Sequence, residues 1–168
     1  MLNQLTHTST DFPNKTFPIK IICDGVRGPA NVGALFRVCE AFGVSEIVFC
    51  NAEINFKSNR LRKTARNTEK TVPYRIADDI LSEIAQLKKD HYSPLVLELT
   101  DQSVPVEAVS AKTEKIALII GNEQHGVSKT VLQAVSQSVH ITMFGQNSSL
   151  NVTQATAIAL FNLTKLLK

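Results

Sequence analysis

Residues 115–128, KIALIIGNEQHGVS, are the most informative stretch of the chain. An apolar run typical of a buried strand stops at Gly121, and a second glycine, Gly126, follows five positions later. This spacing is similar to that of a loop that binds phosphate groups. Such a loop requires lysine where Val127 stands, and Glu123 inside the turn would repel phosphate. The stretch therefore argues against a nucleoside triphosphate, while a plain strand-to-helix turn stays open.

Length and composition indicate an ordinary globular domain. The 168 residues are enough for one domain with a substantial core, and 43% of them are hydrophobic. No apolar run is long enough to span a bilayer, and residues 1–18 lack the apolar core of a signal peptide. The three cysteines form no C-x-x-C pattern and no paired framework. These features favour a reducing cytoplasm, and no His, Cys and acid spacing suggests a metal site.

Basic residues gather in residues 57–75. Seven of them lie there against one acid, Glu69, although the net charge of the chain is only +3. Such a cluster is typical of a polyanion site, whereas a solvated surface is the commoner meaning of a charge run. No aromatic array interleaves the cluster, so phosphate contacts would dominate. The residues expected to bind nucleic acid are Arg60, Arg62, Lys63 and Arg66.

Alternating strand and helix signals predict an α/β fold with a mainly parallel sheet flanked by helices. Apolar, β-branched runs predict strands at residues 19–24, 46–50, 94–99, 115–120 and 139–144. Helical spacing predicts helices at residues 34–43, 78–90 and 151–168. We expect the first helix to stop at Gly43. We expect a loose N-terminal arm over residues 1–18 and a single domain over residues 19–168.

Polar, glycine-bearing segments follow three of the predicted strands. DGVRGPANVGALFR follows the first, GNEQHGVS follows KIALII, and GQNSSLNV follows VHITMF. Ligands of parallel sheets bind beyond the carboxyl ends of the strands, so we expect one composite site there. The chain contains no G-x-G, which argues against a dinucleotide site. A nucleotide-dependent oxidoreductase is therefore the weakest of the functions kept open.

The same three segments, in this order, resemble the three motifs of the SpoU (TrmH-type) RNA ribose 2′-O-methyltransferases of the SPOUT superfamily. Residues 29–37 resemble the first motif, residues 116–128 the second with its Gly-Asn-Glu core, and residues 141–161 the third with its Ser-Leu-Asn-Val run. Each motif alone is a weak signal, whereas all three in order are a strong one. The chain departs from the family where Gln124 and His125 stand in place of the usual glycine.

The resemblance implies a fold, a cofactor and a reaction. It implies a deep trefoil knot at the C-terminal end, S-adenosylmethionine as methyl donor, an obligate homodimer, and methyl transfer to a ribose 2′-hydroxyl of tRNA or rRNA. The family's rRNA enzymes often carry an extra N-terminal domain, so the short segment before the first strand favours tRNA. A non-catalytic RNA-binding module that keeps the fold is the alternative function.

By the same resemblance, Arg37 assists removal of the hydroxyl proton. Because a guanidinium stays protonated, Arg37 would either hold the adjacent phosphate or stabilise developing alkoxide charge, and a plain surface arginine is the alternative. Asn31 would orient Arg37 or the ribose, with helix capping as its alternative. A carboxylate at Glu123 would stabilise a nearby sulfonium or guanidinium. Ser149 and Asn151 complete the expected catalytic set, again with helix capping as the alternative.

The resemblance places cofactor binding at Gly121, Ile141 and Leu150, with Glu98 as a weaker candidate. Adenine needs an apolar slot with backbone donors and acceptors. Ile141 and Leu150 are also ordinary core residue types, and both interpretations hold together because such a slot is a gap in the core. His125 is expected to be a loop residue rather than a ligand.

Overall fold

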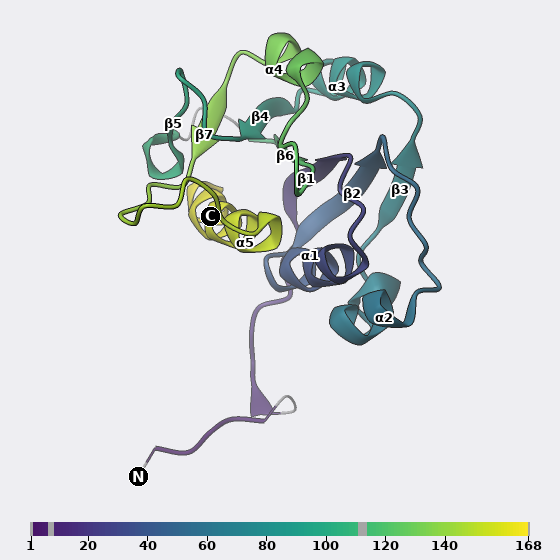
Figure 1. Cartoon of the computed structure of the whole chain (residues 1–168). Coiled ribbons are helices and arrows are strands. Elements are labelled where there is room, and N and C mark those ends of the chain that lie inside the picture. Colours follow the sequence, from purple (N-terminus) through teal and green to yellow (C-terminus); the bar gives the residue numbers. More distant parts are fainter. Residues whose placement is uncertain (1, 7–8, 111–113, 168) are drawn as a thin grey trace.

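The computed structural model describes residues 2–6, 9–110 and 114–167. One seven-stranded sheet lies between two layers of helices (Figure 1). The strand order is β3-β2-β1-β6-β4-β7-β5, and every neighbouring pair in it is parallel. The predicted class, α/β with a mainly parallel sheet flanked by helices, is confirmed.

The elements follow one another along the chain as alternating strands and helices. The strands are β1 (Phe17–Asp24), β2 (Val44–Cys50), β3 (Tyr74–Ala77), β4 (Ser93–Leu97), β5 (Val104–Pro105), β6 (Ile116–Gly121) and β7 (Ser138–His140). The α-helices are α1 (Pro29–Ala41), α2 (Asn59–Ala65), α3 (Ile80–Lys89), α4 (Lys129–Ala134) and α5 (Val152–Leu166). Two 3₁₀ helices of the described part of the chain are η2 (Thr68–Lys70) and η3 (Val106–Ala108).

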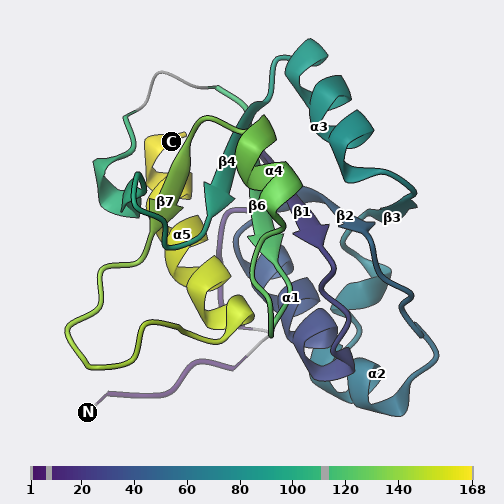
Figure 2. The same ribbon diagram turned by 45° about the horizontal axis from the view of Figure 1, so that its top comes forward.

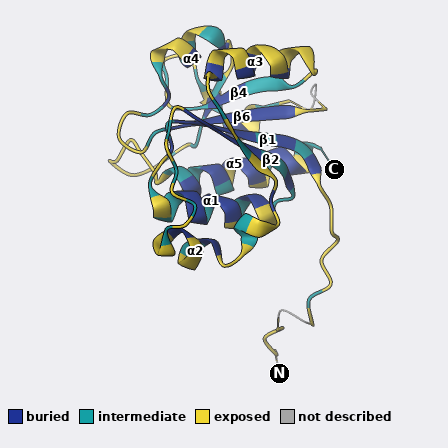
Figure 3. Cartoon of the chain, turned by 90° about the vertical axis from the view of Figure 1, so that its right-hand side faces the viewer, coloured by how far each residue is buried: buried dark blue, intermediate teal, exposed yellow. Residues whose placement is uncertain are grey.

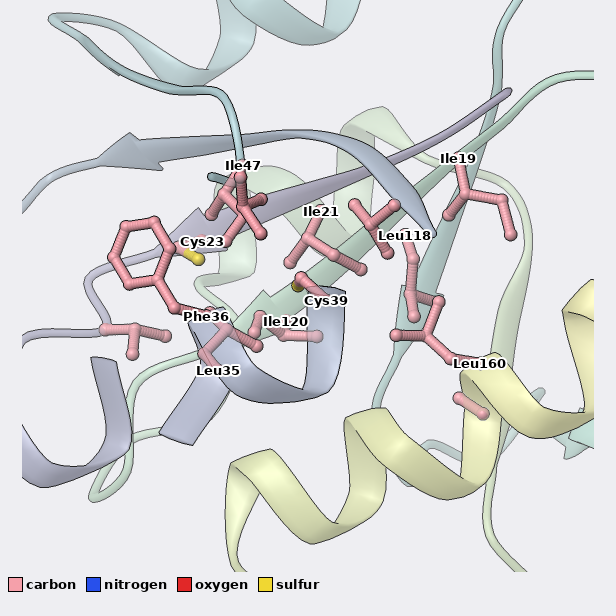
Figure 4. Close-up of a cluster of buried hydrophobic side chains, with 14 of the residues drawn as sticks. Ile19, Ile21, Cys23, Leu35, Phe36, Cys39, Ile47, Leu118, Ile120 and Leu160 are labelled. Carbon is pink, nitrogen blue, oxygen red and sulfur yellow. The ribbon is translucent and has the colours of Figure 1, made fainter. Parts of the chain in front are cut away.

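The central strands bury both of their faces. Figure 3 shows α3 and α4 on one face of the sheet and α1, α2 and α5 on the other. One core cluster joins Ile21 of β1 with Leu35 of α1 and Leu160 of α5 (Figure 4). The other cluster joins the next residue of β1, Ile22, with Ile84 of α3. Because successive side chains of a strand point to opposite faces, continuous apolar runs such as β1 and β6 fill both clusters.

Helix α1 begins earlier than the sequence predicts. The prediction starts at residue 34, whereas α1 starts at Pro29. Proline is favoured at this position because the first helical turn leaves its N–H groups unpaired in any case. Gly28 is the N-cap, so capping, the alternative weighed for Asn31, is wrong. The predicted stop is confirmed, since Gly43 follows the cap residue that ends the helix.

Two strands are shorter than predicted. The sequence predicts a strand over residues 139–144, but β7 ends at His140. Strand β4 likewise ends at Leu97, which leaves Glu98 beyond the sheet. Ile141 and Met143 instead line a cavity at the carboxyl edge of the sheet. A short apolar run does not distinguish a strand face from a cavity wall, which is why the prediction fails here.

The basic segment contains a helix that the sequence does not predict. Leu61 and Ala65 of α2, four residues apart, are buried, so α2 has one apolar side. That side packs on α1 at Gly33, where an added Cβ would lie 2.4 Å from Leu61 O. A seven-residue helix with four basic residues or amides on its outer side carries no clear amphipathic signal, and close packing on α1 stabilises it.

The chain before β1 leads away from the body of the protein (Figure 1). Its described residues form no α-helix or β-strand, and β1 begins two residues before the predicted position 19. At the other end, α5 packs beside α1, as Figures 1 and 2 both show. The knot implied for this C-terminal end stays a prediction. Within the described ranges, no helix combines the length and apolar content needed to cross a membrane.

Candidate active site

The three polar segments meet beyond the carboxyl edge of the sheet. Asn31 Nδ2 donates a hydrogen bond to Glu123 Oε1 over 3.0 Å. Asn151 Nδ2 donates to Asn31 Oδ1 over 3.0 Å. These two bonds join residues that are 92 and 120 positions apart in the chain. Helix α1, the loop after β6 and the start of α5 therefore each contribute one residue to a continuous hydrogen-bonded network, which we call the Glu123 network.

Glu123 is the anionic centre of this network. Its Oε1 also accepts a hydrogen bond from the backbone N–H of Gly28 over 3.0 Å. Partial shielding from solvent raises the pKa of Glu123, but hydrogen bonds from the Asn31 side chain and from backbone N–H groups, including those of Gly28 and Arg27, outweigh it. The pKa of Glu123 therefore lies below its ordinary value. At neutral pH the site holds a fixed negative charge.

Asn151 is a helix cap and a network member at once. Its Oδ1 accepts from the backbone N–H of Thr153 over 2.9 Å and from the Thr153 hydroxyl over 2.5 Å. This leaves its Nδ2 free to donate to Asn31. The capping interpretation is therefore confirmed for Asn151 and is compatible with a place in the shared site. Ser149 is exposed and, within the described part of the chain, its hydroxyl has no hydrogen-bond partner.

The loop that carries Glu123 is closed on itself and tied to β1. Backbone bonds of 3.0 and 2.9 Å pair Asn122 with Gly126, which has φ of 66°. Asn122 Nδ2 donates to the carbonyl of Gly25 over 2.8 Å. A Cβ at Gly121 would lie 2.2 Å from the carbonyl carbon of Gly126, so the turn closes only around a glycine. The closure of the loop therefore accounts for both glycines, and a bound phosphate group is not needed to explain them.

A buried carboxylate that the sequence analysis missed anchors the other end of this loop. Asp24 is 4% exposed, and its Oδ2 accepts from the backbone N–H of Ser128 over 2.8 Å. Its Oδ1 accepts from Asn51 Nδ2 over 2.8 Å. Ser128 is the N-cap of α4, but its hydroxyl makes no capping bond, so the bond from its backbone N–H to Asp24 is what holds the start of this helix against β1. The available signal was an acid that ends an otherwise apolar strand.

A cavity of about 730 Å³ lies beside the Glu123 network. Glu98 lines this cavity. Its carboxylate is held in place because Oε2 accepts from the N–H of Val127 over 3.1 Å and Oε1 accepts from the N–H of Leu99 over 2.9 Å. His125 also lines this cavity, although the sequence predicts only a loop role for it. The cavity is lined by all four residues expected to bind a cofactor and by three of those expected to be catalytic: Gly121, Ile141, Leu150, Glu98, Glu123, Ser149 and Asn151.

Arg37 does not join this assembly. Its side chain is exposed on α1, and it is not among the residues that line the cavity. Arg37 lies six positions after Asn31 on the helix, which corresponds to about 9 Å along the axis and about 120° around it. Among the residues described, its guanidinium has no hydrogen-bond or ion-pair partner. Within one chain, Arg37 therefore occupies the position of an ordinary surface arginine, which was the alternative interpretation.

The expected nucleic-acid contacts form an exposed basic face on α2. Arg75, which the sequence groups with them, is not available, because its guanidinium pairs with Glu46 and Glu83. The acids that match it come from β2 and α3, so counting charges along the segment does not find them. The four residues expected to bind are all exposed at or next to α2: Arg60, Arg62, Lys63 and Arg66.

The cysteines offer no nucleophile. All three are buried and unpaired. Burial raises the pKa of Cys50 to about 12 and raises the pKa values of Cys23 and Cys39 well above the ordinary value of a thiol. Thiols with such pKa values stay protonated and inert. Across residues 2–6, 9–110 and 114–167, no cluster of three or more His, Cys, Asp or Glu side chains has a metal-binding arrangement.

The comparison with protein families covers all three of the segments that carry these motifs. The model of the SpoU rRNA Methylase family covers residues 18–161. The chain belongs to this family. The resemblance that the three segments carry is therefore confirmed, and the Glu123 network joins one residue from each of the SpoU motifs.

Curated relatives of this SpoU chain are named for two kinds of RNA. The 23S rRNA (guanosine-2′-O-)-methyltransferase of Haemophilus influenzae is 28% identical over 152 residues, which cover 90% of this chain and 61% of that protein. The tRNA (guanosine(18)-2′-O)-methyltransferase of Aquifex aeolicus is 28% identical over 141 residues, covering 84% and 66%. The chain spans about three fifths of the length of the first relatives it matches.

Solved structures share the fold of this SpoU chain. The A. aeolicus TrmH/SpoU tRNA modifying enzyme superposes with a TM-score of 0.79 at 24% identity, covering 91% of this chain and 77% of that one. The AdoMet-bound rRNA methyltransferase from Sinorhizobium meliloti gives 0.82 at 23% identity, covering 94% and 59%. At these identities the likeness establishes the fold, and function has to be argued from the site.

Proposed function

We propose that this protein is an enzyme that transfers a methyl group from S-adenosylmethionine to a ribose 2′-hydroxyl of RNA. The observation that carries the proposal is the Glu123 network, which brings Glu123, Asn31 and Asn151 together at the rim of a ligand-sized cavity. Membership of the SpoU family supports the same reaction. The Haemophilus and Aquifex relatives are named as ribose 2′-O-methyltransferases of rRNA and tRNA.

The residues around the larger cavity fit the methyl donor. A volume of about 730 Å³ lies within the usual range for small-molecule sites of roughly 300–1,000 Å³. Ile141, Met143 and Leu150 supply apolar walls for an adenine ring, and the backbone of Gly121 supplies polar groups. The carboxylates of Glu98 and Glu123 favour the positive charges of the donor. When bound, S-adenosylmethionine would supply an electrophilic methyl group.

Glu123 acts as a fixed charge rather than as the proton acceptor. Its lowered pKa makes it a weak base, because proton transfer is most effective when the pKa of the base lies near the working pH. Its carboxylate holds Asn31 through one hydrogen bond, and Asn151 holds Asn31 through another. The Asn31 amide is therefore fixed on both sides. A fixed amide orients a ribose hydroxyl at little entropic cost.

Arg37 keeps the role that the family resemblance implies, as a proposal. The unpaired guanidinium would hold a phosphate next to the target ribose, which then helps to take the proton of the 2′-hydroxyl, or it would stabilise charge on the 2′-oxygen while that proton passes to water. The methyl group takes the place of the proton, and S-adenosylhomocysteine leaves. Because Arg37 lies on the exposed side of α1, the RNA has to reach over that helix to contact it. Helix α2 packs on α1, so the exposed basic residues of α2 lie on the helix next to the one that carries Arg37. The proposal therefore places the RNA across both helices.

Transfer of label from radioactive S-adenosylmethionine to bulk tRNA and bulk rRNA tests the reaction. We expect incorporation that alkali-resistant dinucleotides assign to the ribose, with tRNA as the favoured substrate. Arg37→Ala should abolish it. If the protein binds both S-adenosylmethionine and RNA without any transfer, the non-catalytic RNA-binding module replaces this proposal. If NAD raises the melting temperature and S-adenosylmethionine does not, the oxidoreductase alternative replaces it.

The basic face of α2 is tested by the dependence of RNA binding on salt. Replacing Arg62, Lys63 and Arg66 by glutamine should weaken RNA binding and lower the slope of log Kd against log salt by about 2 to 3, at roughly 0.7–0.9 for each contact. The affinity for S-adenosylmethionine should not change. An unchanged slope in the triple variant would remove α2 from the RNA-binding surface.

We propose the remaining expectations in the same way: a homodimer, a cytoplasmic protein, and a catalytic domain over residues 19–168 preceded by an arm over residues 1–18. Ile158 and Phe161 of α5 are 39% and 53% exposed, and apolar side chains of this kind support a protein contact on that helix. Light scattering after size exclusion should give twice the mass of the chain, 18.5 kDa, and Phe161→Glu should give the single mass.

A further inference from the structure

A second, smaller hollow of about 260 Å³ lies on the α1 side of the loop that carries Glu123. It is lined by Arg27, Gly28, Asn31, Asn122, Glu123 and Gln124. The larger cavity shares three of these residues, Asn122, Glu123 and Gln124. This three-residue stretch is therefore the partition between the two cavities. Neither Arg27 nor the smaller hollow was expected from the sequence.

The lining of the smaller hollow selects a polar ligand. It contains no large apolar side chain. Arg27 is exposed, and in the described part of the chain its guanidinium has no hydrogen-bond or ion-pair partner. Gln124 is exposed as well, with its backbone N–H fixed to Asn122 Oδ1 over 2.9 Å and its side-chain amide unpaired within the same ranges. The hollow thus offers an unpaired cation and, at the partition, an amide that both donates and accepts.

The size of the hollow indicates that it takes a part of a larger molecule. About 260 Å³ is below the usual range for a complete small-molecule site. Glu123 lines the hollow and would repel a phosphate placed beside its carboxylate, so an anionic group would have to lie against the guanidinium of Arg27. Uncharged hydroxyl and base-edge groups fit beside Glu123 and Gln124. One nucleotide of a longer chain carries both kinds of group, an anionic phosphate and uncharged hydroxyl and base-edge groups.

We infer that the smaller hollow is the subsite for the target nucleotide of the RNA, with Arg27 on a flanking phosphate and Gln124 on the nucleobase. The inference rests on the proposed function, because it needs a donor in the larger cavity and an acceptor across the partition. A ribose here would lie next to Asn31 and Glu123. Gln124 lines the hollow and is exposed, so its side-chain amide is accessible to a bound ligand.

The role of Arg27 is tested by RNA binding, without any turnover. Arg27→Gln should weaken the binding of a mixed tRNA pool about tenfold at low salt, since contacts to charged groups are the strong ones. It should also lower the slope of log Kd against log salt by roughly 0.7–0.9. Lys89→Gln is the matched control, because Lys89 is an exposed cation on α3, across the sheet from the site. If both variants show the same slope, the phosphate contact of Arg27 is disproved.

The role of Gln124 is tested by substrate preference. Once the methylated position is mapped, four transcripts that differ only in that nucleotide are compared by kcat/KM. Gln124→Ala should change the preference between the best and the second-best nucleotide by about tenfold or more, as a lost base contact does. Gln137→Ala, an exposed glutamine before β7, should leave the preference unchanged. An unchanged preference in Gln124→Ala would disprove the base contact.

Failure of the inference differs from failure of the proposed function. A wild-type protein that methylates RNA, with Arg27→Gln and Gln124→Ala behaving as their controls, overturns the subsite and leaves the function intact. A wild-type protein that binds RNA but never methylates it overturns the function, and the base contact of Gln124 falls with it. The salt slope of Arg27→Gln then still decides whether the hollow binds a phosphate group. S-adenosylmethionine affinity should be unchanged in Arg27→Gln, because Arg27 does not line the larger cavity.

Discussion

The two loops that enclose the larger cavity are built in opposite ways. The loop over residues 122–128 is held by its own backbone, by Asp24 and by Glu98. The loop over residues 141–150 is mostly exposed. Within the described part of the chain, its one hydrogen bond is from the Thr142 hydroxyl to a Glu107 carboxylate over 3.4 Å. Both loops line the same cavity.

The difference separates two tasks of a binding site. A fixed charge near a reaction centre has to be held in one place, because a displaced charge loses much of its effect. A cavity that admits a ligand needs a wall that can move aside, and weakly bonded loops supply such walls. We therefore expect the tied loop, residues 122–128, to be intolerant of change and the open loop, residues 141–150, to be tolerant.

The largest effect should come from adding one methyl group to each loop region. A Cβ at Gly121 would lie within 2.2–2.5 Å of three backbone atoms of Gly126 and Val127, whereas a Cβ at Gly145 would meet nothing within 4 Å. Gly121→Ala should therefore lower the free energy of unfolding by about 3 kcal/mol, through overpacking against backbone. Gly145→Ala should change it by less than about 0.5 kcal/mol. Urea unfolding measures both, and equal effects would remove the contrast between the loops.

The catalytic candidates on the two loops should also differ. Glu123 is part of the hydrogen-bonded network, whereas Ser149 has no partner within the described part of the chain. Glu123→Gln should lower kcat for methyl transfer about a hundredfold, the usual size for loss of one preorganised charge. Ser149→Ala should lower it by less than about tenfold. A larger loss in Ser149→Ala than in Glu123→Gln would reverse the assignment of the two loops.

The sequence predicts this contrast only in part. Apolar runs and the order of the three motifs are local patterns, so they predict the sheet, the shared edge and the meeting of Glu123 with Asn31 and Asn151. The anchoring residues are not local patterns. Asp24 binds Ser128 across 104 positions, and no spacing rule links an acid at a strand end to a backbone N–H so far away.

The prediction of ion pairs from the sequence fails for the same reason. Arg75 is one more cation along the basic segment, yet its partners come from β2 and α3. Similarly, the motif pattern places Arg37 near Asn31 by number, while the helical turn of α1 points the two residues apart. Sequence patterns therefore predict which segments meet more reliably than which side chains of those segments face one another.

A smaller effect should follow from loosening the tied loop at Asp24. Both carboxylate oxygens of Asp24 accept hydrogen bonds, one from the N–H of Ser128 and one from the side-chain amide of Asn51. In Asp24→Asn one of these oxygens becomes an NH₂ group, which cannot accept, so one buried hydrogen bond is lost. We expect the free energy of unfolding to fall by about 2 kcal/mol. Asp11→Asn, at an exposed position in the arm, is the matched control and should change it by less than about 0.5 kcal/mol. Equal stability of the two variants would show that Asp24 does not anchor the loop.

The smallest effect should be a dependence of stability on acid pH that belongs to the tied loop alone. The native pKa of Glu123 lies below its ordinary value, so folding favours the ionised form. The stabilisation is then complete above the unfolded carboxyl pKa of about 4.3 and is lost as the pH falls through the lower native value. Urea unfolding between pH 6 and the acid limit should show wild type losing stability relative to Glu123→Gln in that window.

Glu107→Gln, which removes the carboxylate bonded to the open loop, should follow wild type, because a 3.4 Å contact contributes little. Parallel curves for wild type and Glu123→Gln would mean that the hydrogen bonds from Asn31 and Gly28 do not favour the carboxylate, and the tied loop would then hold its shape without holding a charge.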